Sequence, residues 1–97
     1  MAEIINTINS FPYNGISAAK LIANSSFESR LISLEKGAKL TPHISNKDAL
    51  LVLLEGQIDF HIEETTFKLK PFQGLSFKKN ETHWVDAIVN SKFLLLR

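Results

Sequence analysis

The sequence predicts an all-β fold, a small antiparallel β-barrel made of two sheets. Four glycines divide the chain into short runs rich in Ile, Leu, Val and Phe, which is the pattern of many short strands joined by turns. Residues 57–63 alternate strictly between polar and apolar side chains, as expected of a strand with one buried face. Residues 50–54 are apolar at every position, so we expect this strand to be covered on both faces.

The first fifteen residues are ambiguous. Ile4, Ile5 and Ile8 would share one face of a short helix, but a proline and a glycine soon after them end any longer one. The segment could pair with its own barrel or cross to a second chain. After it, residues 16–23 and 27–35 are predicted strands because both are rich in apolar and β-branched side chains.

Two consecutive strands are predicted in the middle of the chain. The apolar strand 50–54 is followed by Glu55 and Gly56, which we interpret as a tight turn or bend. In the alternating strand 57–63, the apolar side chains are expected to share the buried face and the polar ones the other face. The predicted buried set is Ile58, Phe60 and Ile62, and the predicted outward set is Asp59, His61 and Glu63.

The last third of the chain continues the same pattern. Residues 66–69 and 75–77 are predicted strands separated by a segment with proline and glycine. Residues 78–82 form a polar turn, in which an asparagine tolerates a left-handed backbone. Residues 84–89 and 92–96 are then two further predicted strands.

Length and composition exclude several classes of protein. With 97 residues, of which 44% are hydrophobic, residues 1–97 are predicted to form one domain. A net charge of +1 with interspersed charges gives no basic face for nucleic acid. The absence of cysteine excludes disulfides and thiolate metal sites. No apolar run approaches the ~20 residues of a membrane span, and no signal peptide is evident, so we expect a cytoplasmic protein.

One constellation carries chemical information. Gly37, His43 and Gly56 follow the spacing Gly-x(5)-His-x(12)-Gly, with Pro42 directly before the histidine. This spacing resembles the first motif of the cupin family, and His83 matches the histidine of the second. The resemblance covers residues 32–97, leaves residues 1–15 as an N-terminal segment, and is strongest to small single-domain bacterial cupins. It implies the RmlC-like, double-stranded β-helix or jelly-roll fold, with a pocket inside the barrel.

The departures from the family pattern concern its metal site. In metal-binding cupins, two histidines and a glutamate of the first motif join the histidine of the second around one divalent ion. Here the second histidine position is Ser45 and the glutamate position is Ala49. Alanine cannot bind a metal, and a neutral serine hydroxyl is a weak ligand for a transition metal. The second motif departs at Phe72, Lys78, Asn80 and Ala87.

These residues lead to three functional hypotheses. The first is a protein that binds a small polar or anionic molecule through His43, Ser45 and His83, with no cofactor or only a weakly held divalent metal (Zn, Fe, Ni or Mn). The second is a metal-dependent oxygenase or isomerase that uses His43 and His83 as ligands. Whether the protein is an enzyme stays open, and the missing ligands favour the first hypothesis. Strand parity and the family register predict the apolar walls of the pocket to be Leu51, Leu53, Phe77, Val85 and Ala87.

The third hypothesis is a dimeric interaction module whose cavity has lost its role. If Leu51 and Leu53 fill the barrel, then Leu50, Val52 and Leu54 point to the other face and need a cover. Trp84, next to His83, is expected to face outward for the same reason and to need a cover as well. A homodimer supplies such a cover most simply.

Two polar groups near the predicted site have other expected roles. Asp48 is one residue from the missing glutamate position, so strand alternation turns it away from a bound ion. His61 is expected on the solvated face. Lys78 and Lys79 could attract an anion to the mouth of the barrel, although with Glu81 nearby they also suit an ordinary charged turn.

Overall fold

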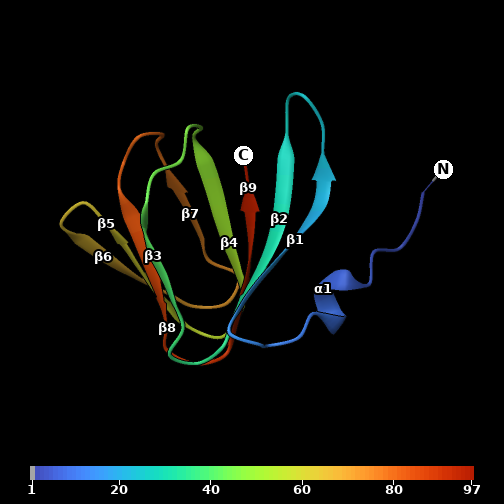
Figure 1. Ribbon diagram of the computed structural model, residues 1–97, viewed down its shortest axis with the longest axis horizontal. Helices are drawn as coiled ribbons and strands as arrows, with labels where there is room; N and C mark the ends of the chain where they lie inside the picture. The colour runs from blue at the N-terminus through green and yellow to red at the C-terminus, as the bar shows by residue number, and fades with distance from the viewer. Residues whose placement is uncertain (1) are drawn as a thin grey trace.

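The computed structural model describes residues 2–97 and shows nine strands preceded by one short helix, α1 (Thr7–Ser10) (Figure 1). One antiparallel sheet has the strand order β1-β2-β9-β4-β7, and the other has the order β3-β8-β5-β6. These two sheets confirm the predicted all-β fold class. The strands are β1 (Ile16–Ala23), β2 (Glu28–Leu34), β3 (Lys39–His43), β4 (Ala49–Glu55), β5 (Ile58–Ile62), β6 (Thr65–Leu69), β7 (Gly74–Phe77), β8 (His83–Ala87) and β9 (Ser91–Leu96).

The strand that the sequence did not predict is β3. It is short, contains Pro42, and its residues are mostly exposed. Its pairing with β8 also shifts register between Leu40 and His43. Without an apolar alternation, these residues carry no periodic signal. The only helix in residues 2–97 is α1, and no helix there is long and apolar enough to cross a membrane.

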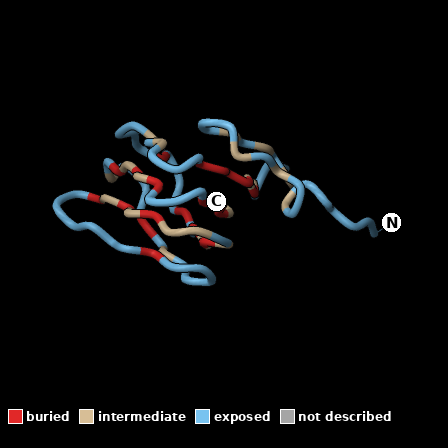
Figure 2. The backbone as a smooth tube through the Cα atoms, turned by 90° about the horizontal axis from the view of Figure 1, so that it is seen from below, coloured by how far each residue is buried: buried red, intermediate tan, exposed pale blue. Residues whose placement is uncertain are grey.

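The hydrophobic core lies between the two sheets and takes side chains from both, and Figure 2 shows the buried residues in red along the strands, with the N-terminal segment largely exposed. The alternation predicted for the fifth strand is confirmed, because Ile58, Phe60 and Ile62 are all buried whereas Asp59 and His61 are only half-buried. The four-stranded sheet therefore turns one apolar face inward. The core consists of Ile32, Leu34, Ala49, Leu51, Leu53, Ile58, Phe60, Ile62, Leu69, Phe77, Val85, Ala87 and Phe93.

The turn between β4 and β5 needs glycine for two reasons. Gly56 has a φ of +90°, a backbone conformation that L side chains rarely adopt. A Cβ atom at this position would lie 2.3 Å from Ser91 Oγ and 2.4 Å from the carbonyl oxygen of Asn90. The turn therefore packs directly against the start of β9.

The outer face of the five-stranded sheet is incompletely covered by its own chain. Leu51 and Leu53 are buried on the inner face, whereas Leu50 is 39% exposed and Val52 and Leu54 are half-buried on the other. Within the described residues of one chain, the fourth strand is therefore fully covered on one side only.

The N-terminal segment lies along one end of that outer face, and its described residues before α1 extend away from the barrel (Figures 1 and 2). The buried ammonium of Lys92 donates a hydrogen bond to the carbonyl of Ile8 at 2.8 Å and lies 3.5 Å from Glu55 Oε1. The Tyr13 hydroxyl donates to the same carboxylate. Burial and this hydrogen bond raise the pKa of Tyr13. The segment is thus attached to its own barrel.

Candidate functional site

The structure brings the two motif histidines together. His43 at the end of β3 lies directly opposite His83 at the start of β8 in the antiparallel register. Their ring centroids are 4.2 Å apart, with the planes inclined at 63°. Adjacent strand ends therefore place two imidazoles in edge-to-face contact at one end of the barrel.

Backbone carbonyls orient both rings in the same way. Nδ1 of His43 lies 2.7 Å from the carbonyl of Thr41, and Nδ1 of His83 lies 3.0 Å from the carbonyl of Glu81. A carbonyl only accepts, so each Nδ1 carries a hydrogen, and in the neutral form of each ring Nε2 keeps its lone pair. Neither Nε2 atom has a hydrogen-bond partner within residues 2–97. The pair thus presents two unused acceptors.

The two histidines differ in environment. His83 is 4% exposed and packs against both Phe60 and Phe77, whose ring centroids lie 5.5 Å and 4.7 Å from its own. Burial lowers the pKa of His83, and the neighbouring His43 lowers it further, against an opposing effect of the Glu81 carbonyl. His43 itself is exposed. The buried ring is therefore held neutral beside an accessible one.

The predicted apolar wall residues are all buried, but they lie at different distances from the histidine pair. Phe77 contacts His83 directly. Val85 lies two residues further along the same strand, opposite Phe60. Leu51, on the other sheet, is 1% exposed and belongs to the packed core, as do Leu53 and Ala87.

Ser45 has a structural task in the loop that follows β3. Its hydroxyl lies 2.8 Å from the carbonyl of Lys47 and accepts a hydrogen bond from the backbone N–H of the same residue at 3.2 Å. The guanidinium of Arg97 also donates to it at 3.3 Å. Ser45 lies beyond the end of the strand, so strand alternation does not fix its direction. Its hydroxyl is engaged by protein groups.

The donor set does not fit the resident metal of metal-binding cupins. Ala49 replaces the glutamate, and the two nearby carboxylates serve the loop before β8. Asp48 Oδ1 accepts the backbone N–H of Lys79 at 3.0 Å, and Glu81 Oε1 accepts that of Lys78 at 3.2 Å. Within residues 2–97, no three His, Asp or Glu side chains form a group that could hold a metal ion. Protein zinc sites use at least three such ligands.

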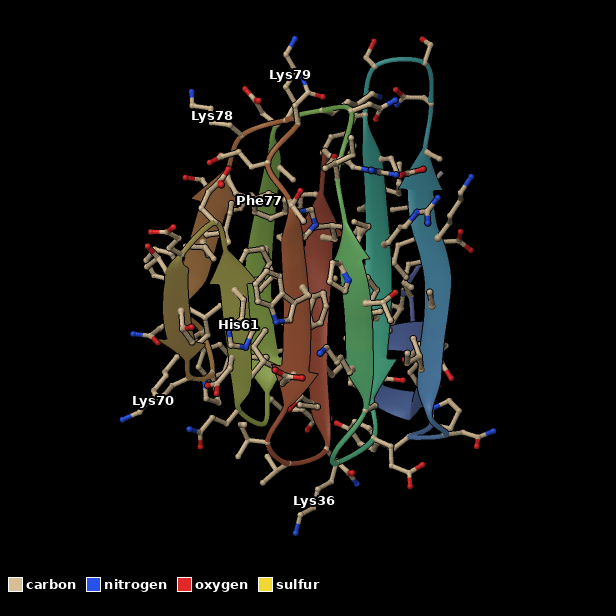
Figure 3. The ribbon with its side chains drawn as sticks, turned by 60° about the vertical axis from the view of Figure 1, so that its left-hand side comes forward. Lys36, His61, Lys70, Phe77, Lys78 and Lys79 are labelled. Carbon is tan, nitrogen blue, oxygen red and sulfur yellow. The ribbon has the colours of Figure 1, made fainter. Side chains whose placement is uncertain are left out.

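Two surface hollows flank Phe77 at this end of the barrel. One, of about 140 Å³, is lined by Asp48, Ala49, Ser76, Phe77 and Lys78. The other, of about 200 Å³, opens between β7 and the β5–β6 hairpin. Lys78 and Lys79 lie on the loop just beyond Phe77 (Figure 3). Neither lysine has an ion-pair partner in the described part of the chain.

The third histidine, His61, alternates with the buried residues of β5 and so lies on the outer face of the four-stranded sheet (Figure 3). Its Nε2 lies 2.9 Å from Asp86 Oδ2 and its Nδ1 lies 2.8 Å from Thr66 Oγ1. The ring stacks on half-buried Trp84, with centroids 4.9 Å apart. His61 is therefore a bonded member of a surface network, which its alternating sequence pattern alone did not indicate.

Sequence reasoning missed the carbonyls that orient the site. Both carbonyls belong to the residue two positions before the histidine, Thr41 in one strand and Glu81 just before the other. This shared offset holds both rings in the same tautomer. It depends on backbone geometry and leaves no side-chain pattern in the sequence.

Comparison with known proteins identifies the architecture. No family model and no curated protein matches the chain. An RmlC-like cupin protein from Desulfovibrio desulfuricans superposes with a TM-score of 0.87 at 17% identity, over 99% of this chain and 95% of that one. A conserved protein of unknown function from Streptococcus pyogenes gives 0.87 at 19% identity, over 99% and 86%. A cupin 2 conserved barrel domain protein from Leptotrichia buccalis gives 0.84 at 25% identity, over 95% and 45%. These likenesses confirm the fold that the motif spacing implied.

Proposed function

We propose that this small protein of the cupin, RmlC-like fold binds a small polar molecule at the mouth of its barrel, through His43 and His83 and without a resident metal. The observation that carries the proposal is the pair of Nε2 acceptors left free while both Nδ1 atoms donate to backbone carbonyls. Such groups over an aromatic floor are the usual composition of a small-molecule site.

The chemistry of the pair indicates the kind of ligand. An Nε2 atom that carries no proton accepts a hydrogen bond, so the pair suits a molecule that presents hydroxyl groups. Lys78 and Lys79 add positive charge to the same end of the barrel, which attracts an anion over longer range (Figure 3). A hydroxylated carboxylate satisfies both requirements.

NMR of the histidine Cε1–H groups tests the proposal, with sodium gluconate as the probe and succinate, which has no hydroxyl, as the comparison. We expect gluconate at millimolar concentration to shift the His43 and His83 signals saturably and succinate to shift them little. The binding should be lost in His43→Ala, because this variant lacks one of the two Nε2 acceptors. The variant should still fold, because the His43 ring is exposed and its removal leaves the core intact. The matched control is His61→Ala, which should bind as the wild type does. Equal binding by His43→Ala, or no saturable shift, would overturn the proposal.

Metal content tests the enzyme alternative. The metal-dependent oxygenase or isomerase hypothesis requires a bound ion, and the donor set described above counts against it. Elemental mass spectrometry of untagged protein should give no more Zn, Fe, Ni or Mn than a His43→Ala/His83→Ala control. Near-stoichiometric metal that disappears in the control would replace the present proposal with the metal-dependent one.

A homodimer is a separate proposal, supported by the outer face of the five-stranded sheet. Leu50 pairs with Leu96 and Val52 with Leu94 across β4 and β9, so these four apolar side chains share the outer face. Leu50 is 39% exposed and the others are half-buried. Light scattering should give twice the mass of one chain for the wild type and the mass of one chain for Leu50→Lys. A single-chain mass for the wild type at tens of micromolar would refute the dimer.

A further inference from the structure

We propose that the hollow between β7 and the β5–β6 hairpin is a second binding site, for a free α-amino acid with a large apolar side chain. The hollow has a volume of about 200 Å³. It opens where the edge strands of the two sheets approach each other, since β7 and β6 each end their sheet. It is lined by Ile62, Phe67, Leu75, Ser76, Phe77, Lys78 and Glu81.

The wall of the hollow is apolar and of a suitable size. Ile62 and Phe67 come from the hairpin, and Leu75 and Phe77 come from β7. Phe67 is 38% exposed, whereas Phe77 is 6% exposed, so one ring borders the opening and the other forms the floor. A cavity of about 150 Å³ with apolar walls holds a benzene ring. The side chain of phenylalanine or leucine therefore fits this volume.

Two opposite charges border the same hollow. The Lys78 ammonium has no ion-pair partner within residues 2–97. Glu81 uses Oε1 to accept the backbone N–H of Lys78 at 3.2 Å, and its Oε2 has no hydrogen bond in that part of the chain. The lining thus offers a cation for a carboxylate and a carboxylate oxygen for an ammonium group.

Charge complementarity selects a zwitterion over a simple acid or amine. A carboxylic acid would pair with Lys78 but would be repelled by Glu81, and an amine would meet the reverse arrangement. An α-amino acid satisfies both charges with one compact group and leaves its apolar side chain for the hollow. The inference shares Lys78 with the function proposed for the histidine pair, but neither His43 nor His83 lines this hollow, so the two proposals can fail separately.

Isothermal titration and NMR with L-phenylalanine test the site, with 3-phenylpropionate and phenethylamine as the comparison ligands. These two ligands lack the ammonium group and the carboxylate respectively. We expect saturable binding of L-phenylalanine and at least about tenfold weaker binding of the other two, because a hydrogen bond to a charged group contributes about 1.5–3 kcal/mol. The shifted amide signals should belong to β7 and the β5–β6 hairpin.

Three variants and two matched controls locate the binding. Lys78→Met and Glu81→Gln should each weaken L-phenylalanine binding about tenfold, and the amide oxygen that Glu81→Gln introduces still accepts from the backbone of the loop. Phe67→Ala should weaken it as well, and this half-exposed position tolerates truncation. The controls are Lys36→Met and Glu64→Gln, exposed side chains that do not line the hollow.

Each outcome decides the inference. Loss of binding in the three variants but not in the controls supports the site, whatever the result for His43→Ala and gluconate. Equal binding of 3-phenylpropionate, together with unchanged binding by Glu81→Gln, would show a site for simple acids and overturn the amino-acid assignment. Absence of saturable L-phenylalanine binding by folded protein would overturn the site itself.

Discussion

Replacement of Gly56 by alanine, which adds one Cβ atom, should strongly destabilise the folded chain. The new Cβ atom would lie 2.3 Å from Ser91 Oγ and 2.4 Å from the carbonyl oxygen of Asn90, well inside van der Waals contact. Ser91 Oγ accepts the backbone N–H of Gln57 at 3.0 Å and lies 2.8 Å from the carbonyl of Val89. The substitution therefore disturbs both the turn and the hydroxyl that ties it to β9.

The magnitude follows from two separable costs. A non-glycine residue at a φ of +90° is strained, by about 1–3 kcal/mol. Overpacking against a backbone carbonyl, which no side-chain rotation relieves, adds about 1–3 kcal/mol. We expect Gly56→Ala to lower the free energy of unfolding by the sum of these costs, about 2–6 kcal/mol, which is a large part of the about 5–15 kcal/mol typical of a domain.

Gly37→Ala is the matched control. Gly37 has a similar φ of +84°, but no heavy atom lies within 4 Å of its ideal Cβ position. It should carry the backbone cost alone, about 1–3 kcal/mol. Urea unfolding followed by the fluorescence of Trp84, the one tryptophan of the chain, gives both values. Equal losses for the two variants would refute the steric reasoning and leave only the backbone term.

Three further predictions concern charged and titratable groups. Burial and the neighbouring His43 lower the pKa of His83, so an NMR titration should show its ring protonating below the usual value of about 6.5, with a higher pKa in His43→Ala. Because the unfolded chain then binds the proton more readily, this group should lower stability as the pH falls below about 6.5. The hydrogen bond from Arg97 lowers the pKa of Glu28. The ionised Glu28 carboxylate therefore contributes fully to stability above the usual glutamate pKa of about 4, and this contribution is lost at lower pH. As the pH is lowered, the urea midpoint of Glu28→Gln should accordingly fall less steeply than that of the wild type. Lys92→Met should lower stability by about 1–2 kcal/mol and speed hydrogen exchange in residues 8–13, while the amides of β4 and β9 remain protected.

Most of the fold could be predicted from the sequence, because most of its strands are short runs of apolar and β-branched residues bounded by turn residues. Ile58, Phe60 and Ile62 alternate with polar residues, and all three are buried. Gly56 marked a turn, and a positive φ there confirms it. The third strand lacked such a signal because Lys39–His43 is short and mostly exposed.

The site was harder to predict from the sequence than the fold, since its details depend on contacts between distant segments. Spacing singled out His43 and His83, but nothing in the sequence indicated which ring nitrogen each would present. Ser45 matches a ligand position by counting, whereas in the structure its hydroxyl bonds to Lys47 and Arg97. Arg97 is 52 residues further along the chain, so no local pattern could have indicated that contact.

The position of β9 has a consequence for how the chain is made. This strand follows the other eight in sequence, yet it lies between β2 and β4 and pairs with both. During synthesis the two flanking strands therefore emerge with no neighbour on their facing edges. Unpaired strand edges and exposed apolar side chains favour aggregation. We expect nascent chains to need shielding until residues 91–96 have left the ribosome, after which the five-stranded sheet closes in one late step.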